Sequence, residues 1–494
     1  MRLFLMLCSL LCLPASAAET ELILRGTLRG DAHQTYVRLP FTVPPGAQRL
    51  TLEFDYTGKE QRSVIDLGLF GPNGDLRGWS GGNKRLITIS TVDATPSYLP
   101  TSPMAGTWGL LLGVPNMRAG AQADYTAKLT FSMDLAASSD PAVLRAPLRN
   151  EARWYRGDLH SHTAHSDGSC ANTSGTQTVP CPAFLTAQAA ASRKLDFVAV
   201  TDHNGVGHAH ALRELQPYFD QVLLMPGREL TSFSGHANLY GTLAPVDFRV
   251  TKAGQSWNDV LAASRKAGGI VSLNHAVRPS GEACMGCGWE APQTDMSLVS
   301  AIEAVNGADA DTEWSALAYW QAQLARGYRI TAIGGSDNHR ITLTQSGAQG
   351  GALGMPTTVV YARELSQAAI LDGIRAGRVY VDVQGAGRTL EWQAQTGGAQ
   401  AGMGEALAAP AGAKVRFTLR ATGSSGGRFE VLADGKPAPA AWRAQVQSGD
   451  DSVTVDWTSD GKPHWWRADV RDAAGKLVLL GNPVYLNYPA AGLS

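Results

Sequence analysis

Alternation of apolar and polar residues dominates the first part of the chain. Between residues 20 and 140, short segments place apolar side chains at every second position, and turns such as GPNGD and SGGNK separate them. A period of two is typical of β-strands with one buried face. The clearest predicted strands are YVRLPFTV, QRLTLEFDY, SVIDLGLFG, GTWGLLLGV and DYTAKLTFSM. The pattern predicts a β-sandwich over 19–140, followed by a linker at 141–150.

At residue 151 the pattern changes to apolar strands that alternate with helices. Amphipathic segments predict helices at 183–195, 256–269, 312–327 and 365–377. This alternation is typical of β/α folds, whose functional residues lie at the carboxyl ends of the strands. Helical patterns stop after 385, and alternating segments predict a C-terminal, Ig-like β-domain at 386–494. The chain is therefore predicted to be multidomain, with a central β/α domain at 151–385.

Residues 1–18 are predicted to be an export signal. Arg2 precedes an apolar run from Leu3 to Leu13, and Ala15-Ser16-Ala17 supplies small residues for cleavage. The run is too short to span a bilayer, and no later segment is long and apolar enough to do so. We expect a secreted or periplasmic protein without an integral membrane segment, whose mature chain begins near Ala18 or Glu19.

Four cysteines remain after the predicted cleavage. Pairing between sequence neighbours would join Cys170 to Cys181 and Cys284 to Cys287. The segment CMGC is alternatively half of a zinc site, but the chain holds no second C-x-x-C, so disulfides are favoured. The formal net charge is −1 and only 17% of the residues are charged. A chain without a basic surplus is not expected to bind nucleic acid.

Histidine placement is the strongest chemical signal. The chain has 11 histidines, and all but His33 and His464 lie between residues 160 and 339. Imidazole nitrogen and carboxylate oxygen suit divalent Zn, Mn or Fe. Alternate residues of a strand point the same way, so closely spaced pairs such as His160 and His162 can hold one ion together. At least seven ligands predict two or three ions, and two-metal sites are built for hydrolysis.

The motifs HSHTAHSDG, TDHN, GRE, NH and SDNH follow one another in this order. In that order they resemble the PHP domain, named for polymerase and histidinol phosphatase. The resemblance covers about 151–385 and implies a distorted (β/α)7 barrel with two or three metals. The domain layout and the terminal GNPVYL resemble the secreted branch that includes carbaryl hydrolases.

The resemblance also implies roles for single residues. A first ion would be held by His160, His162, Glu229 and Asp337. Glu229 would bridge to a second ion, shared with His275 and His236. A third position would consist of Asp167, His203 and His339, with His165 as an alternative to Asp167. Catalytic roles are expected for Glu229, Asp337, His203 and His339.

Other residues near these motifs are expected to play supporting roles. Asp158 and Asp202 are predicted to orient imidazoles. His208 and His210 match no motif and are predicted to lie in a loop or on a helix surface. Three arginines lie within three residues of a predicted ligand and are either surface groups or a clamp for an anionic substrate: Arg228, Arg278 and Arg340.

These features predict a secreted, metal-dependent hydrolase that cleaves phosphoric esters of small molecules, as a phosphodiesterase or phosphatase. No Gly-x-Ser-x-Gly elbow is present, so a serine nucleophile is not expected. One alternative is a carboxyl or carbamate ester hydrolase that uses the same metals. Another is a non-catalytic protein that binds a surface.

Overall fold

The computed structural model describes residues 19–82, 84–92, 94–133, 146–251, 254–281, 284, 286–341, 351–438, 442 and 451–488. The predicted export signal lies outside these residues. The chain divides into two compact units, Met1–Ser138 and Ser139–Ser494. Among the described helices, none is long and apolar enough to cross a membrane. The predicted domain boundaries themselves stay predictions.

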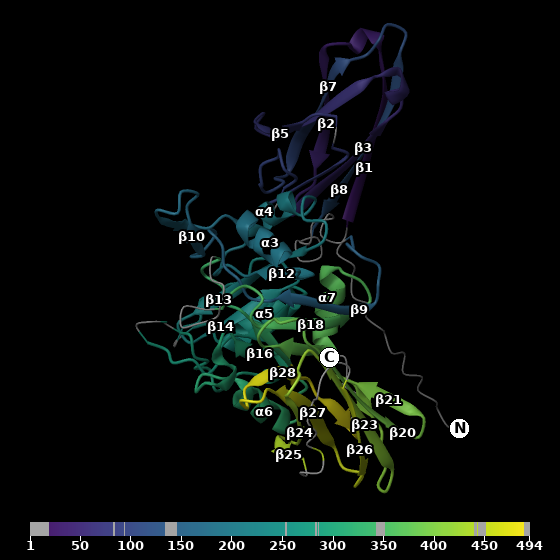
Figure 1. Ribbon diagram of the computed structural model, residues 1–494. Coiled ribbons are helices and arrows are strands. Elements are labelled where there is room, and N and C mark those ends of the chain that lie inside the picture. Colours follow the sequence, from purple (N-terminus) through teal and green to yellow (C-terminus); the bar gives the residue numbers. More distant parts are fainter. Residues whose placement is uncertain are drawn as a thin grey trace, which may run out of the picture. The chain divides into compact units, whose positions relative to one another are not determined.

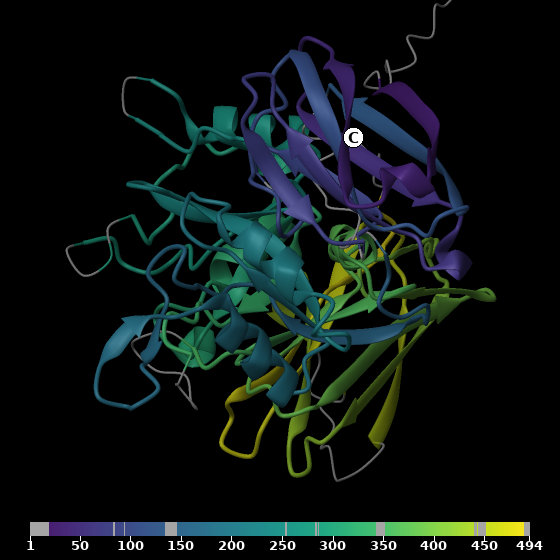
Figure 2. The same ribbon diagram turned by 90° about the horizontal axis from the view of Figure 1, so that it is seen from above.

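The N-terminal unit is a sandwich of two antiparallel, four-stranded sheets, as its alternating pattern predicts (Figures 1 and 2). One sheet has the order β1-β8-β3-β6 and the other β2-β7-β4-β5. Alternate residues of β8, such as Tyr125, Leu129 and Phe131, are buried in the shared core. The strands are β1 (Glu19–Arg29), β2 (Thr35–Val43), β3 (Arg49–Tyr56), β4 (Val64–Phe70), β5 (Leu76–Ser80), β6 (Leu86–Ser90), β7 (Gly106–Asn116) and β8 (Gln122–Ser132).

The second unit is built on a large mixed sheet. Its central part has the order β17-β16-β15-β14-β13-β12-β9-β18-β19. These strands are β9 (Arg153–Asp158), β12 (Phe197–Val200), β13 (Leu223–Ser232), β14 (Gly235–Tyr240), β15 (Ile270–Leu273), β16 (Ala301–Asn306), β17 (Thr331–Gly335), β18 (Thr357–Ala362) and β19 (Val379–Asp382). The short strands β12 and β15 are buried at every position, because other elements cover both faces of this sheet.

A (β/α)7 barrel is not shown by the described elements and stays a prediction. The described residues contain five α-helices: α3 (Ala183–Ser192), α4 (His208–Leu215), α5 (Trp257–Lys266), α6 (Leu317–Ala325) and α7 (Gln367–Arg375). β13 runs directly into antiparallel β14 through a tight turn between Ser232 and Gly235, which leaves no room for a helix. β14 and β15 are antiparallel too, as are β9 and β18. The parallel β/α repeat is therefore interrupted twice.

The C-terminal residues form two β-layers around a core that includes Trp392, Phe417 and Trp466 (Figure 1). One layer is a separate sheet of order β21-β20-β23-β26. The other continues the central sheet, because β28 pairs with β19. The strands are β20 (Thr389–Thr396), β21 (Ala399–Gly402), β22 (Ala406–Leu407), β23 (Lys414–Thr422), β24 (Arg428–Ala433), β25 (Lys436–Pro437), β26 (Asp451–Thr458), β27 (His464–Arg471), β28 (Leu477–Gly481) and β29 (Val484–Leu486).

Both predicted disulfides are present. Cys170 pairs with Cys181, which ties together the hairpin of β10 (Ser169–Ala171) and β11 (Thr178–Pro180). Cys284 pairs with Cys287 in the loop between β15 and β16. Each bond closes a loop next to residues that the sequence predicts as metal ligands.

Candidate metal centre

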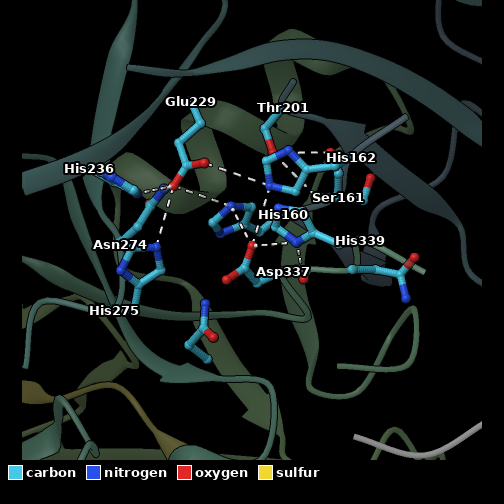
Figure 3. A network of polar contacts seen from close by, with 12 residues as sticks. His160, Ser161, His162, Thr201, Glu229, His236, Asn274, His275, Asp337 and His339 are labelled. Atoms are coloured by element: carbon cyan, nitrogen blue, oxygen red, sulfur yellow. Dashed lines mark hydrogen bonds and ion pairs between the residues drawn. The ribbon is translucent and has the colours of Figure 1, made fainter. Parts of the chain in front are cut away.

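The predicted ligands meet at one edge of the central sheet. Those that follow a strand are His160 and His162 after β9, His203 after β12, His275 after β15, and Asp337 and His339 after β17. Glu229 and His236 lie within the antiparallel pair β13 and β14. Parallel bridges join Ser161 to Asn338 and His203 to Glu229, and these bridges hold the loops side by side. Figure 3 shows the labelled histidines, Glu229 and Asp337 pointing toward one another.

Glu229 lies at the middle of this arrangement, and its two carboxylate oxygens face different histidines (Figure 3). Oε1 lies 3.3 to 3.5 Å from one ring nitrogen each of His160, His236 and His275. Oε2 lies 2.9 Å from Nδ1 of His203 and 3.6 Å from Nε2 of His162. The side chain is 1% exposed, so these imidazoles replace water around both oxygens.

Asp337 faces the same two histidines from the opposite loop. Its Oδ1 lies 3.2 Å from Nε2 of His160 and 3.3 Å from Nε2 of His162. The backbone N–H of Asp337 donates to the His160 carbonyl, and its φ of +53° turns the chain so that the carboxylate points inward. His160, His162 and Asp337 form one buried group whose ligand atoms lie within 4.8 Å of one another.

A second group of four lies at the more exposed side of the cluster. Oδ1 of Asp167 is 3.4 Å from Nε2 of His339, 3.6 Å from Nε2 of His203 and 3.9 Å from Nδ1 of His162. The side chain of Asp167 is 57% exposed. The ring of His165 instead lies beside that of His208, with centroids 6.3 Å apart. Of the two alternatives, the structure brings Asp167 to the histidines.

Three buried atoms of the cluster form no hydrogen bond: Nε2 of His160, Nε2 of His162 and Oε2 of Glu229. These atoms face one another or other ligand atoms at 2.9 to 3.6 Å without forming hydrogen bonds, and a metal ion would satisfy all three. The donors are imidazole nitrogens and carboxylate oxygens, which suit Zn, Mn or Fe. The residues present therefore fit a centre for divalent metal ions.

Charged neighbours shift the pKa values of several residues in the cluster. Against the effect of burial, imidazoles lower the pKa of Glu229, and carboxylates raise the pKa values of His160 and His203. Burial acts to raise the pKa of Glu229, but the surrounding imidazoles outweigh it and hold that pKa well below its ordinary value. Burial acts to lower the pKa of His203, but Glu229 and Asp167 raise it to about 9. The pKa of His160 is likewise raised well above its ordinary value, because three carboxylates outweigh its burial.

Metal loading at about pH 7 is therefore expected to release protons, since metals bind neutral imidazole and the metal-free His203 carries a proton there. Above its pKa of about 9, the contribution of His203 should vanish, because that proton has already left. Calorimetry in two buffers of different ionisation enthalpy measures the protons released. Replacement of His203 by Gln should lower the number, and equal heats in both buffers would contradict the expectation.

Asp158 and Asp202 have a different supporting role from the one predicted, because they bind backbone N–H groups of the ligand loops. Asp158 accepts from the N–H groups of His160, Ser336 and Gly354. Asp202 accepts from the N–H and the hydroxyl of Thr163, each at 2.7 Å. These carboxylates fix the loops that carry the ligands, and neither contacts the imidazole of a predicted ligand.

His208 corrects a further expectation. The sequence predicts it in a loop or on a helix surface, yet it is fully buried at the start of α4. Its Nδ1 lies 3.0 Å from Oδ2 of Asp202, and this contact helps to hold the pKa of that carboxyl far below its ordinary range, although burial acts to raise it. His208 therefore supports the loop after β9 through Asp202.

Glu303 belongs to none of the predicted motifs; it lies on β16 and is 1% exposed. Its Oε1 is 3.0 Å from Nδ1 of His160, and its Oε2 accepts from the backbone N–H of His275 at 3.2 Å. A carboxylate on the outer nitrogen of a ligand imidazole fixes the ring and makes it a better ligand. The available signal was a charged residue in the middle of an otherwise apolar strand, AIEAV.

Replacing Glu303 by Ala should weaken metal binding by about 10- to 100-fold, because His160 loses the acceptor that orients its ring. Glu303→Gln should cost less, since its amide oxygen can still accept from Nδ1 of His160. Competition with a chromophoric chelator measures both affinities. Equal losses in the two variants would indicate that the negative charge matters and the hydrogen bond does not.

Of the three predicted clamp arginines, the structure brings Arg278 to the cluster. Its Nη1 lies 3.7 Å from Oδ2 of Asp337, and its Nε donates to Asp309 at 2.7 Å. Arg228 is buried, and its Nη2 donates to the carbonyl of Ala244. Glu229 points into the cluster, so its strand neighbour Arg228 points to the other face. The side chain of Arg340 is exposed at the end of the Asp337 loop.

Two solved structures provide a comparison. One is a two-domain protein from Bacteroides vulgatus, described as containing a predicted PHP-like metal-dependent phosphoesterase. It is 16% identical, covers 68% of this chain and 98% of its own, and has a TM-score of 0.39. The other, from Bifidobacterium adolescentis and provisionally named a metal-dependent phosphoesterase, is 16% identical, covers 44% and 94%, and has a TM-score of 0.29. The carbaryl-hydrolase subgroup stays a prediction. No protein-family model and no curated protein matches this chain.

Proposed function

We propose that this chain is a metal-dependent hydrolase that cleaves phosphoric esters of small molecules with an activated water. The observation that carries the proposal is the buried Glu229 carboxylate, which divides its oxygens between two sets of imidazoles. A structural glutamate needs one cation to balance its charge. A carboxylate that faces ligand nitrogens on both oxygens is suited to bridge two ions.

The proposed ligand sets follow the groups in the cluster. The first ion is assigned to His160, His162, Glu229 and Asp337, and the second to Glu229, His236 and His275. A third position is assigned to Asp167, His203 and His339. Two or three Mn, Zn or Fe ions match this set of nitrogen and oxygen donors.

Each side chain has a role that its surroundings support. Divalent ions held in such a centre lower the pKa of a bound water from about 15.7 to roughly 7 and polarise the ester oxygen. Glu229 is proposed to bridge the first and second ions, and Asp337 is proposed to bind the first. His203 and His339 are 26% and 31% exposed, so either of them can donate a proton to the departing group when the third position holds no ion.

Arg278 is proposed to hold a nonbridging phosphate oxygen. Burial acts to lower the pKa of its guanidinium, but Asp337 and Asp309 raise it, so the group stays charged. Asp309 binds Nε and leaves Nη1 next to the metal ligands, which fixes the direction of the positive charge. Arg228 and Arg340, the other predicted clamps, have no described contact with the cluster, and Arg340 stays a candidate by its exposed position.

One observation favours the carboxyl or carbamate ester alternative: Arg228 and Arg340 have no described contact with the cluster. Two of the three guanidinium groups are not brought to the cluster, so less positive charge faces a substrate than the sequence predicts. A neutral ester needs no such charge. The non-catalytic alternative has less support, because a purely surface-binding protein has no use for buried ligand atoms without hydrogen bonds.

The decisive experiment is a substrate screen with metal-free protein reloaded with Mn or Zn. Bis(p-nitrophenyl) phosphate, p-nitrophenyl phosphate and p-nitrophenyl acetate represent the three ester classes. We expect the diester to be hydrolysed fastest, the monoester more slowly and the acetate least, with all activity lost on chelation. Acetate hydrolysis that dominates and depends on metal would replace the proposal by the carboxyl ester alternative.

A further inference from the structure

A cysteine sulfur lies beside the two histidines assigned to the second ion. Sγ of Cys287 and one ring nitrogen each of His236 and His275 all lie within 4.8 Å of one another, and the three residues are buried. The rings of His236 and His275 are 5.2 Å apart and nearly perpendicular. The segment CMGC is predicted to form a disulfide or, alternatively, half of a zinc site, and this geometry connects the two possibilities.

The backbone places Cys287 at this position firmly. Its carbonyl accepts from Nδ1 of His275 at 2.9 Å, which leaves Nε2 of that ring facing Glu229. Gly286 adopts a φ of +78°, and a Cβ there would lie 2.2 Å from the carbonyl oxygen of Ser232. Only glycine fits between this loop and the β13–β14 turn. Cys287 is therefore held against the cluster by the loop itself as well as by its disulfide.

The disulfide determines what the sulfur can do. Thiolate is the form of cysteine that binds metals strongly, and zinc centres accept cysteine and histidine together. A sulfur in a disulfide carries no such charge. Cys284 is only partly buried, so a reductant can approach the bond from its side.

We propose that Cys287 is a further ligand of the second metal position, available only when the Cys284–Cys287 disulfide is reduced. This inference rests on the proposed metal centre. In the oxidised protein the second ion has Glu229, His236 and His275. In the reduced protein the Cys287 thiolate joins them, and the softer ligand favours Zn or Co over Mn.

A phosphine can reduce the Cys284–Cys287 disulfide to two thiols. The S–S bond breaks and takes up two electrons and two protons, which gives the two thiols. The phosphine is oxidised to its oxide with an oxygen from water, and that water supplies the two protons. On metal binding the Cys287 thiol loses its proton to the buffer, and a sulfur–metal bond forms.

Cobalt(II) spectroscopy of the protein without residues 1–18, and so without Cys8 and Cys12, tests this inference without relying on activity. Visible d–d bands report cobalt bound to histidine and carboxylate, and a near-ultraviolet charge-transfer band reports a thiolate ligand. Oxidised protein should show the first and lack the second. Treatment with tris(2-carboxyethyl)phosphine should add the charge-transfer band.

Two matched variants separate the two sulfurs. Cys284→Ser leaves Cys287 free and should show the charge-transfer band without reductant. Cys287→Ser should lack the band even after reduction, although reduction also frees Cys170 and Cys181. Reduced wild-type protein gives the same test without any substitution, so a variant that misfolds does not decide the result.

The outcomes distinguish the two proposals. If d–d bands are present in every sample but reduction adds no charge-transfer band, Cys287 is not a ligand and the metal centre stands. A band that persists in reduced Cys287→Ser protein would also overturn the assignment to Cys287. If no sample binds cobalt, the metal centre itself fails, and with it the proposed function.

Discussion

Replacing Glu229 by Gln is expected to remove more than one metal ion per chain and to reduce turnover below detection. Gln has the same shape but no charge, and its amide nitrogen cannot bind a metal as a carboxylate oxygen does. Both faces of the residue are surrounded by imidazoles, so one substitution damages two metal positions together. Loss of the negative charge also leaves a protonated His203 without its closest carboxylate, which further opposes metal loading.

Elemental analysis of the purified protein, together with turnover on the preferred ester, measures both effects. Glu214→Gln is a suitable control, because this residue is exposed on α4 and makes the same chemical change away from the cluster. It should retain the metal content and activity of the unchanged protein. Full metal occupancy in folded Glu229→Gln protein would refute the bridging role.

Much of the candidate centre could be predicted from the sequence, because strand ends constrain where side chains go. Residues such as His160, His275 and Asp337 each come directly after a short strand. The strands share one sheet, so residues at their carboxyl ends gather at one edge. All nine predicted metal ligands lie in the cluster, seven of them after strand ends and Glu229 and His236 within the β13–β14 pair, although binding itself stays a proposal.

The residues that the sequence did not reveal act through tertiary contacts. Glu303 reaches His160 from a strand far along the chain, and His208 reaches Asp202 from a helix. Neither belongs to a motif, and no local pattern indicates the partner. The orientation of Arg228, in contrast, could be predicted from the sequence. Arg228 is next to Glu229 in a strand, so its side chain must point to the opposite face.

The fold was less predictable than the site because it depends on strand direction. Periodicity indicates that a segment is a strand, but parallel and antiparallel neighbours give the same pattern when both faces are buried. The segment from Leu230 to His236 holds a turn and no helix, and this was the one local sign that β13 and β14 form a hairpin. The pairing of β19 with β28 joins segments about 100 residues apart, which no local pattern predicts.

Arg278→Ala is expected to lower kcat/KM for a phosphodiester by about 10²-fold, as for the loss of one strong transition-state donor. That factor corresponds to about 2.7 kcal/mol of lost stabilisation. Charge builds on the nonbridging oxygens as the phosphoric ester reacts, so the fixed guanidinium next to Asp337 should matter most in the transition state. Hydrolysis of the neutral p-nitrophenyl acetate should change little.

Steady-state kinetics of the metal-loaded variant on both substrates, with metal content measured in the same samples, tests this expectation. Arg375→Ala removes a guanidinium that pairs with Asp372 on α7 and serves as the matched control. Arg340→Ala measures whether the exposed arginine contributes as well. If Arg278→Ala retains its metals and loses both activities equally, Arg278 supports Asp337 and does not hold a phosphate oxygen. If it loses neither while acetate remains the faster substrate, a carboxyl or carbamate ester becomes the better assignment, because such a substrate has no anionic oxygens for the arginine to hold.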